Sequence, residues 1–369
     1  MGAELRFADG MNKGTKLAQQ SLGMLVALAI LALSLGAAAE DRYKVVRIPV
    51  NHGDTGLPRA LNIYGQVVGS SGEPHGGDSA AFFAQRGGRG LRLATLAGGD
   101  YSEGFAINDL GDVVGSSNTS SSVRAVRWRN GAVTTLAMPP KYSGSEALSL
   151  NDSGTAAGYV SGIAGMHAAK WASDGTVQLL GNLERGQSSQ AAAIDYAGDV
   201  AGWVETNGVT RAFLWTAATG MSLLPGGASS KANGMNDLRQ VVGSCAGVEG
   251  DRACLWTSPA TSENLGTLPG GDHGEAFDIN NAGTVVGAAG TSMGLRAFVW
   301  TRSEGMLDLN SLIPPSSGII LSAAVAINER GEILAYGGVN HDLEQDRNVD
   351  MDHGVHAGPT FVFLLTPTR

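Results

Sequence analysis

The sequence predicts an all-β protein: a seven-bladed β-propeller with four-stranded blades, closed by an N-terminal strand that pairs with the C-terminal blade. Three observations support this fold class: the composition, seven copies of one short motif, and chain ends that together complete one copy. Of the 369 residues, 54 are glycine, 16% are charged and 43% are hydrophobic. Such a composition is typical of strands separated by tight turns.

The repeated motif resembles DINNAGTVVG, the stretch that begins at residue 278. Its Asn or Asp recurs at intervals of 41 to 48 residues. The seven positions are Asn62, Asn108, Asn151, Asp195, Asn236, Asn280 and Asn328. This period falls in the range of four-stranded propeller blades, and a ring of seven such repeats accounts for a domain longer than usual.

Turn signals divide each repeat into four strands. The first strand is rich in small residues and ends in N-x-x-G, where the Asn side chain can bond to the backbone two residues on and Gly takes a left-handed conformation. A strand like QVVGSS follows, then a variable loop, a third strand like RAFLW (211–215), a short turn and a fourth strand. We expect one column of side chains to pack between blades, and its members are Ala84, Trp128, Trp171, Trp215, Trp256, Trp300 and Phe363.

The two chain ends match different strands of one repeat. Residues 42–50 match a fourth strand, and residues 360–369 match a third strand. They therefore predict a ring in which the C-terminus supplies three strands of one blade and the N-terminus supplies the fourth. Closure of this kind removes open sheet edges.

The first 39 residues are typical of a secretory signal peptide. Lys13 and Lys16 precede an apolar run at 22–35, and Ala37 and Ala39 occupy the small positions of a cleavage site. Translation could instead start at Met11, and an uncleaved anchor is the alternative to cleavage. We predict a single propeller domain over 40–369 that is secreted or periplasmic and does not insert into the membrane after cleavage.

The net charge limits the classes of molecule that the protein is expected to bind. Cleavage after Ala39 would remove three of the 25 basic and two of the 34 acidic side chains, so the mature chain stays acidic. Phosphate binding depends on clustered Lys and Arg, so nucleic acid is excluded as a partner. An unidentified protein or glycan is expected instead.

Three motifs in register, I-N-x-x-G-x-V-V-G, R/H-A-F-x-W and L-G-x-L-P-G-G, resemble the HAF repeat family of extracellular bacterial proteins. The resemblance covers essentially the whole of 40–369. Only His167 keeps the His of the His-Ala-Phe element, whereas Arg211 and Arg296 replace it elsewhere; Arg239 stands in place of a turn Gly and Cys254 stands in the Phe column. The resemblance implies an exported propeller and supplies no catalytic residues.

Acidic residues recur at two columns before the shared Asn. The candidates for ligand binding are Asp54, Asp100, Glu103, Glu146, Asp272, His273 and Glu275. The variable loops that carry these columns share one face of the ring, and we predict that this face is acidic where the central channel opens. Because Asp272, His273 and Glu275 fall in repeated columns, a solvated loop is favoured over a catalytic cluster.

One loop matches a Ca²⁺ site in part, with a flexible acidic loop as the other interpretation, and one pair of cysteines predicts a disulfide. The loop 341–356 carries Asp346, Asn348, Asp350 and Asp352 at alternate positions, as the early ligands of a Ca²⁺ loop do, although Met351 stands where an EF-hand needs Gly. We therefore predict no cofactor and treat Ca²⁺ as the alternative. Cys245 and Cys254 flank one hairpin loop, and export would permit a disulfide between them.

Two functions remain open. No nucleophile, triad, phosphate loop or complete metal motif stands out from the repeat. We therefore favour a non-catalytic binding module that acts through its variable-loop face. The alternative is a hydrolase or lyase that acts on an envelope or extracellular glycan through Glu103, Glu146 and Glu275, as paired acids do in glycosidases.

Overall fold

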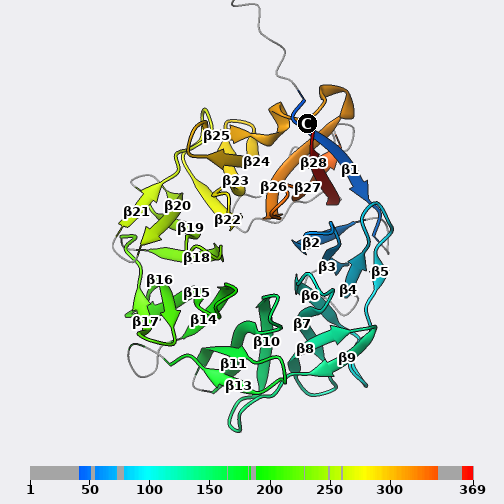
Figure 1. Cartoon of the computed structure of the whole chain (residues 1–369), viewed down its shortest axis with the longest axis vertical. Coiled ribbons are helices and arrows are strands. Elements are labelled where there is room, and N and C mark those ends of the chain that lie inside the picture. The colour runs from blue at the N-terminus through cyan, green and yellow to red at the C-terminus, as the bar shows by residue number, and fades with distance from the viewer. Residues whose placement is uncertain are drawn as a thin grey trace, which may run out of the picture. The chain divides into compact units, whose positions relative to one another are not determined.

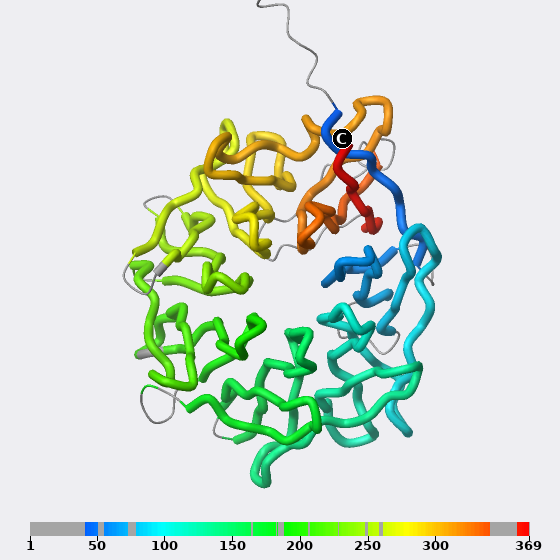
Figure 2. Tube along the Cα trace, viewed as in Figure 1, coloured from blue at the N-terminus to red at the C-terminus, as the bar shows by residue number. Residues whose placement is uncertain are grey.

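A computed structural model describes residues 41–50, 55–72, 79–163, 165–181, 183, 188–227, 229–247, 250–258, 261–339 and 360–368. Asp41–Arg369 is one compact unit, and the predicted signal peptide lies outside the described residues. Within that unit, seven four-stranded antiparallel sheets follow one another around a ring (Figures 1 and 2). The predicted seven-bladed propeller is confirmed.

Each blade is a meander whose first strand lies nearest the axis of the ring (Figure 1). Blades 1 to 4 consist of β2 (Gly56–Leu61), β3 (Val67–Ser71), β4 (Ala80–Ala84) and β5 (Leu91–Arg92); β6 (Ser102–Ile107), β7 (Val113–Asn118), β8 (Val123–Arg129) and β9 (Ala132–Thr135); β10 (Gly144–Leu150), β11 (Ala156–Gly162), β12 (Gly165–Trp171) and β13 (Val177–Leu179); and β14 (Ser189–Ile194), β15 (Val200–Thr206), β16 (Val209–Thr216) and β17 (Gly220–Leu223).

Blades 5 to 7 consist of β18 (Ser230–Met235), β19 (Val241–Ala246), β20 (Asp251–Ser258) and β21 (Thr261–Asn264); β22 (Gly274–Ile279), β23 (Val285–Thr291), β24 (Gly294–Thr301) and β25 (Gly305–Asp308); and β26 (Ile319–Ile327), β27 (Ile333–Val339), β28 (Phe361–Pro367) and β1 (Tyr43–Ile48). Two short 3-10 turns, η1 (Leu309–Ser311) and η2 (Pro315–Ser317), connect blades 6 and 7. Within the described ranges, no helix has the length and hydropathy needed to span a membrane.

The ring closes as the chain ends predict. β1 pairs with β28 along its whole length, from Tyr43 opposite Pro367 to Ile48 opposite Val362. β28 in turn pairs with β27, so blade 7 contains both ends of the domain. Ile48 and the following Val50 are fully buried. The closing strand therefore contributes to the core as well as to the sheet.

The tryptophan column packs between blades. The indole nitrogens of Trp128 and Trp171 donate to the carbonyls of Ala94 and Ala137, 2.7 and 2.6 Å away, each of which belongs to the preceding blade. All five tryptophans of the column are at least 95% buried. Burial identifies all five as core residues, and in Trp128 and Trp171 the indole N–H is also satisfied.

One assignment to that column was wrong. In blade 7 the register places Leu365 opposite Ile333, as Trp128 stands opposite Val113. Phe363 lies two residues earlier, opposite Ala335, in the column of Phe82. In the sequence, residues 340–360 separate β27 from β28, so counting from the turn could not fix this register.

The Asn that begins each N-x-x-G turn binds both its own turn and the next blade. In blade 2, the Asn108 side-chain oxygen accepts the N–H groups of Leu110 and Asp112 at 3.1 and 2.9 Å, and Gly111 has a φ of 79°. The amide nitrogen then donates to the main-chain carbonyl of Asn151 in blade 3. Six such links of 2.8 to 3.3 Å join neighbouring blades, from Asn62, Asn108, Asn151, Asn236, Asn280 and Asn328.

Blade 4 lacks this link because its turn begins with Asp195. A carboxylate cannot donate, and among the described residues no side-chain bond replaces the missing one to Asn236 in blade 5. Asp195 is 2% exposed, and one of its oxygens has no hydrogen-bond partner. Burial is the main cause that raises its pKa. On this face the junction between blades 4 and 5 therefore lacks the asparagine link, and it is crossed instead by the Arg239–Asp199 ion pair and by the bond from the Tyr196 N–H to Asp237.

We expect deletion of residues 42–50 to lower the free energy of unfolding by about 3–6 kcal/mol, since two fully buried aliphatic side chains are lost at about 1.5–3 kcal/mol each. Urea unfolding followed by tryptophan fluorescence would measure the change. Val46→Ala is the control, because Val46 is 50% exposed in the same strand and should change stability little. A truncated chain with the original midpoint would contradict the closure.

We expect Asp195→Asn to stabilise the protein by about 1–3 kcal/mol, since it restores a donor toward Asn236 and removes an unsatisfied buried charge. Because the Asp195 pKa is raised, the charged form is disfavoured on folding above the ordinary Asp range. The gain should therefore be large at pH 7 and shrink in acid, as thermal unfolding at both pH values would show. Asn151→Asp is the reciprocal variant and should destabilise at neutral pH.

Candidate functional site

A β-bulge near the end of each first strand shapes the inner wall of the ring. In blade 2 the pairing of β6 with β7 skips one residue between Gly104 and Ala106, and the same shift recurs in the first strands of the other blades. In blades 1 to 6 the skipped residues are Arg59, Phe105, Leu148, Ala192, Asn233 and Phe277. A bulged residue is free of the ladder and can be re-aimed, which makes this position suited to a site.

Four blades build a cavity of about 400 Å³ on this inner wall, called here the axial cavity. Its lining residues are Arg59, Glu103, Phe105, Glu146, Leu148, Tyr159, Gln190 and Ala192. All but Tyr159 come from the first strands β2, β6, β10 and β14. The structure therefore brings together Glu103 and Glu146, two of the carboxylates that the sequence singled out.

Glu103 is the least compensated group in the axial cavity. Its side chain is fully buried, and the Tyr101 phenol interacts with it, but neither carboxylate oxygen accepts a hydrogen bond of good geometry from the described residues. A buried, unpaired carboxylate is costly, and such groups are normally paired or bonded. Glu103 is therefore suited to a partner that arrives from outside the chain.

Two tyrosines surround the carboxylates. The pKa of Tyr101 and that of Tyr159 are both raised well above the usual tyrosine range, mainly by burial. The charges of Glu103 and Glu146 raise both further, and Tyr159 also bonds to Glu146. Both phenols therefore stay protonated and can act as hydrogen-bond donors at physiological pH.

Arg59 supplies the positive charge of the axial cavity. Its guanidinium lies 5.4 Å from the ring centre of Phe105, within range of a cation–π contact. One exposed guanidinium faces two carboxylates, so the cavity has an excess of negative charge. The acidic channel mouth that the sequence predicts stays a prediction.

Glu275 lies on the inner strand of blade 6, outside the axial cavity. It accepts a 2.8 Å hydrogen bond from Asn233 Nδ2, which also donates to the carbonyl of Ala276. Burial raises the pKa of Tyr336 in blade 7. The charge of Glu275 raises this pKa further, whereas the charge of Arg59 lowers it. Glu275 is thus bonded within the fold, unlike Glu103.

The other acidic candidates occupy local loops. Asp272 and His273 form an exposed pair with 2.7 Å between the carboxylate oxygen and Nδ1, and this bond lowers the pKa of Asp272. Asp100 accepts from Asn118 Nδ2 at 2.7 Å in the neighbouring hairpin. Among the described residues neither Asp100, Asp272 nor His273 lines the axial cavity, and Asp54 lies outside the described range.

The Ca²⁺ candidates Asp346, Asn348, Asp350 and Asp352 also lie outside the described residues. Over the part of the chain that is described, no three His, Cys, Asp or Glu side chains gather as metal ligands would. Cys245 and Cys254 are joined as a disulfide across β19 and β20, with 6.0 Å between their Cα atoms. This bond ties the second and third strands of blade 5.

A second group of acids, which sequence reasoning missed, surrounds the axis on the N-x-x-G face. Each follows the shared Asn, and its side chain accepts the main-chain N–H of the equivalent residue in the preceding blade. These residues are Asp109, Asp152, Asp237 and Glu329, with Asn281 in the same role. Their recurrence directly after the Asn was visible in the sequence. Because these oxygens are used between blades, the group is structural.

No protein-family model and no curated protein matches the sequence. Among solved structures, that of a streptogramin B lyase has a TM-score of 0.55 and 12% identity, covering 89% of this chain and 99% of that chain. A catalytically inactive virginiamycin B lyase from Staphylococcus aureus with quinupristin has a TM-score of 0.54 and 12% identity, covering 88% and 99%. At 12% identity, these similarities show a shared fold.

Asp278, outside the axial cavity, is a carboxylate with a strongly raised pKa. It lies in β22, and its two oxygens accept the N–H groups of Ile279 and of Ile327 in blade 7, both at 2.9 Å. Burial raises its pKa to about 7, against the effect of these two bonds. Asp278 therefore joins blades 6 and 7 through a group that titrates near neutrality.

We expect Asp278 to make stability fall as pH rises from about 4 to about 7, since over this interval the folded protein binds a proton that the unfolded chain does not. The contribution is on the order of a few kcal/mol. Comparing urea unfolding of the original protein and Asp278→Asn at pH 5 and pH 8 isolates it. The variant should have the flatter profile, and equal pH dependence of the two would contradict the assignment.

Proposed function

We propose that the protein is an exported, non-catalytic binding module that takes a small hydroxyl-bearing organic cation in the axial cavity. The observation that carries this proposal is the Glu103 carboxylate, which lines the cavity and is fully buried, with the Tyr101 phenol nearby but without a well-formed hydrogen bond or a cationic partner among the described residues. A cationic group placed against it would supply the missing charge and donors.

The rest of the lining suits the same ligand class. The Tyr159 phenol and the Gln190 amide offer donors and acceptors for hydroxyl groups, while Phe105 and Leu148 offer an apolar side. A volume of about 400 Å³ falls within the range of small-molecule sites. An amino sugar or a hydroxylated amine combines these properties, and it agrees with the glycan or other envelope component expected from the sequence.

Three features support an exported protein with a cationic or neutral ligand. The N-terminal segment reads as a signal peptide, and the disulfide between Cys245 and Cys254 is of the kind that persists in oxidising compartments. The acidic net charge also favours cationic or neutral partners over anionic ones.

A lyase or hydrolase is the second candidate, and two observations favour it. The solved lyases share the propeller along 99% of their own length, so a propeller alone can carry such chemistry. In the axial cavity, Tyr159 bonds to Glu146, and a carboxylate beside a protonated phenol can remove one proton and deliver another. Formation of a product with changed mass from a bound glycan would favour this candidate.

We expect Glu103→Gln to weaken amine binding by about thirtyfold or more, because removal of one partner of a buried charge pair costs at least about 2 kcal/mol. Calorimetry with glucosamine, choline and spermidine would measure it, after a thermal-shift screen selects the binder. The ligand-free variant should also be more stable, since the unpaired charge is gone. Glu205→Gln, on an exposed strand end, is the control. Unchanged affinity in Glu103→Gln would sink the proposal.

A further inference from the structure

Three successive blade junctions, from blade 2 to blade 5, share an equivalent position on the N-x-x-G face, which is filled in one and hollow in the other two. The floor of each groove includes a residue that precedes the tryptophan-column position in the third strand, and its far wall is the turn of the next blade. The floor residues of blades 2, 3 and 4 are Arg127, Lys170 and Leu214. Because the fold is repeated, each groove serves as a comparison for the others.

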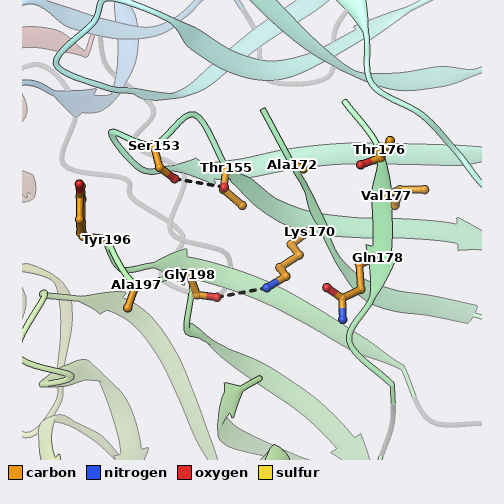
Figure 3. A pocket seen from close by; sticks show the side chains of 10 residues that line it. All are labelled: Ser153, Thr155, Lys170, Ala172, Thr176, Val177, Gln178, Tyr196, Ala197 and Gly198. Atoms are coloured by element: carbon orange, nitrogen blue, oxygen red, sulfur yellow. Dashed lines mark hydrogen bonds between the residues drawn. The ribbon is translucent and has the colours of Figure 1, made fainter. Parts of the chain in front are cut away.

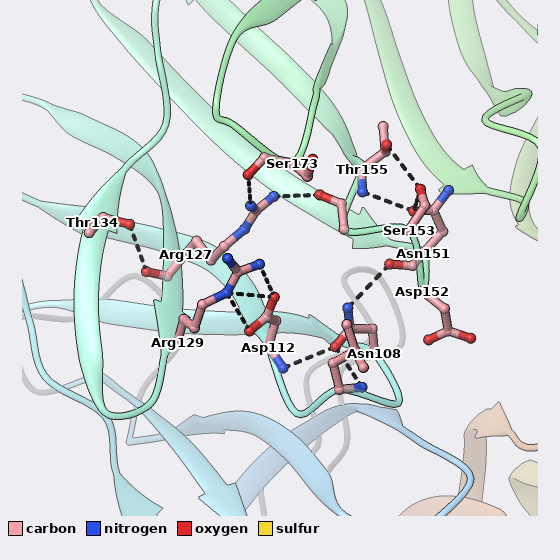
Figure 4. A network of polar contacts seen from close by, with 12 residues as sticks. Asn108, Asp112, Arg127, Arg129, Thr134, Asn151, Asp152, Ser153, Thr155 and Ser173 are labelled. Atoms are coloured by element: carbon pink, nitrogen blue, oxygen red, sulfur yellow. Dashed lines mark hydrogen bonds and ion pairs between the residues drawn. The ribbon is translucent and has the colours of Figure 1, made fainter.

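Between blades 2 and 3 the floor side chain fills the groove. The Arg127 guanidinium donates to the carbonyls of Ser173 and Gly154 at 2.8 and 2.7 Å, and its side chain is buried (Figure 4). Arg129, from the same strand, pairs with Asp112 at the rim. The Arg127 side chain therefore occupies this groove and hydrogen-bonds to two carbonyl groups of blade 3.

Between blades 3 and 4 the floor side chain fills only part of the groove. Lys170 Nζ lies 4.3 Å from the ring centre of Trp215 and 3.5 Å from the Gly198 carbonyl (Figure 3). A cavity of about 280 Å³ remains beside it, with Ser153, Thr155 and Tyr196 on its walls.

Between blades 4 and 5 the floor residue is Leu214, and the groove is a cavity of about 800 Å³, called here the seam cavity. Leu214, Leu224, Val241 and Trp256 are buried and give it an apolar lining. Thr216, Thr219, Ser222 and Thr257 add hydroxyl groups. Asp195, which lacks the inter-blade link, belongs to the same junction.

A cation stands on the wall of the seam cavity. Arg239 donates through Nε to Asp199 at 2.6 Å, and its side chain is 59% exposed. Among the described residues no acceptor engages its two terminal nitrogens. Arg239 also has a φ of 59°, an uncommon conformation for a side chain of its size. The cavity thus combines an apolar floor with guanidinium donors that are free to bind an anion.

We propose that the seam cavity binds a small anionic molecule with an apolar body of one or two rings and a carboxylate or sulfonate that pairs with Arg239. Leu214, Trp256 and Val241 contact the apolar body, and the guanidinium engages two anion oxygens in the fork geometry typical of arginine. This site is separate from the axial cavity, with which it shares no lining residue.

The test uses two fluorescent probes, 1-anilinonaphthalene-8-sulfonate and its uncharged analogue N-phenyl-1-naphthylamine. Leu214→Arg gives the seam cavity the residue type that Arg127 supplies between blades 2 and 3. The arginine should fill the cavity and abolish binding of both probes. Ala218→Trp blocks the cavity from an exposed turn at the rim, so it tests the same point if Leu214→Arg does not fold. Lys170→Arg makes a similar change one groove away and should leave both affinities unchanged.

Arg239→Asn tests the anion contact, since Asn tolerates a positive φ. It should weaken sulfonate binding about tenfold or more, as loss of a charge-assisted contact does, and change binding of the uncharged probe less than about twofold. Arg302→Gln, which removes an exposed guanidinium in blade 6, should change neither. Retained binding in Leu214→Arg or Ala218→Trp would overturn the site, and equal losses for both probes in Arg239→Asn would overturn the anion preference.

Discussion

The structure depends above all on the asparagine that begins each N-x-x-G turn. One side chain satisfies two N–H groups of its own turn and donates to the carbonyl of the next blade, so local turn geometry and ring assembly are fixed by the same group. Because the bond is directed, it also sets the spacing of neighbouring blades on this face. Buried polar networks of this kind specify one arrangement only when every member is satisfied, which is why Asp195 alters the junction that it begins.

Because the turn asparagines hold the blades together, other repeated positions can differ from blade to blade. In blades 1 to 4 the bulge residue, and in blades 2 to 4 also the residue two positions before it, line the axial cavity. The bulge position holds residues as different as Arg59 and Phe105, and the earlier position holds Glu103, Glu146 or Gln190. The floor position between blades changes in the same way, from Arg127 to Lys170 to Leu214. Both cavities therefore arise from substitutions at repeated positions rather than from inserted elements. A repeat scaffold separates the residues that hold it together from those that can acquire a ligand.

The repeat made the fold predictable from the sequence, because period, turn chemistry and chain ends all point to the same closed ring. The site was predictable only in part. Glu103, Glu146 and Glu275 belong to one column, but which of them is left without a partner depends on neighbours such as Asn233, which the blade period alone does not place. The register of β28 was missed because residues 340–359 interrupt the repeat. The seam cavity could have been suspected from Leu214 in place of Arg127, although its volume depends on packing across two blades.

The pairing of β1 with β28 has a consequence for the order of events during biosynthesis. The strand at Tyr43–Ile48 is synthesised before every other strand of the ring, and its partner at Phe361–Pro367 is synthesised after them. Six blades can form from contiguous chain, whereas the seventh can be completed only after β28 has been made. Contacts of such long sequence separation slow folding, because loop closure must precede the gain in contacts. β1 therefore has no partner strand until β28 has been synthesised, and closure of the ring is the last step of its assembly.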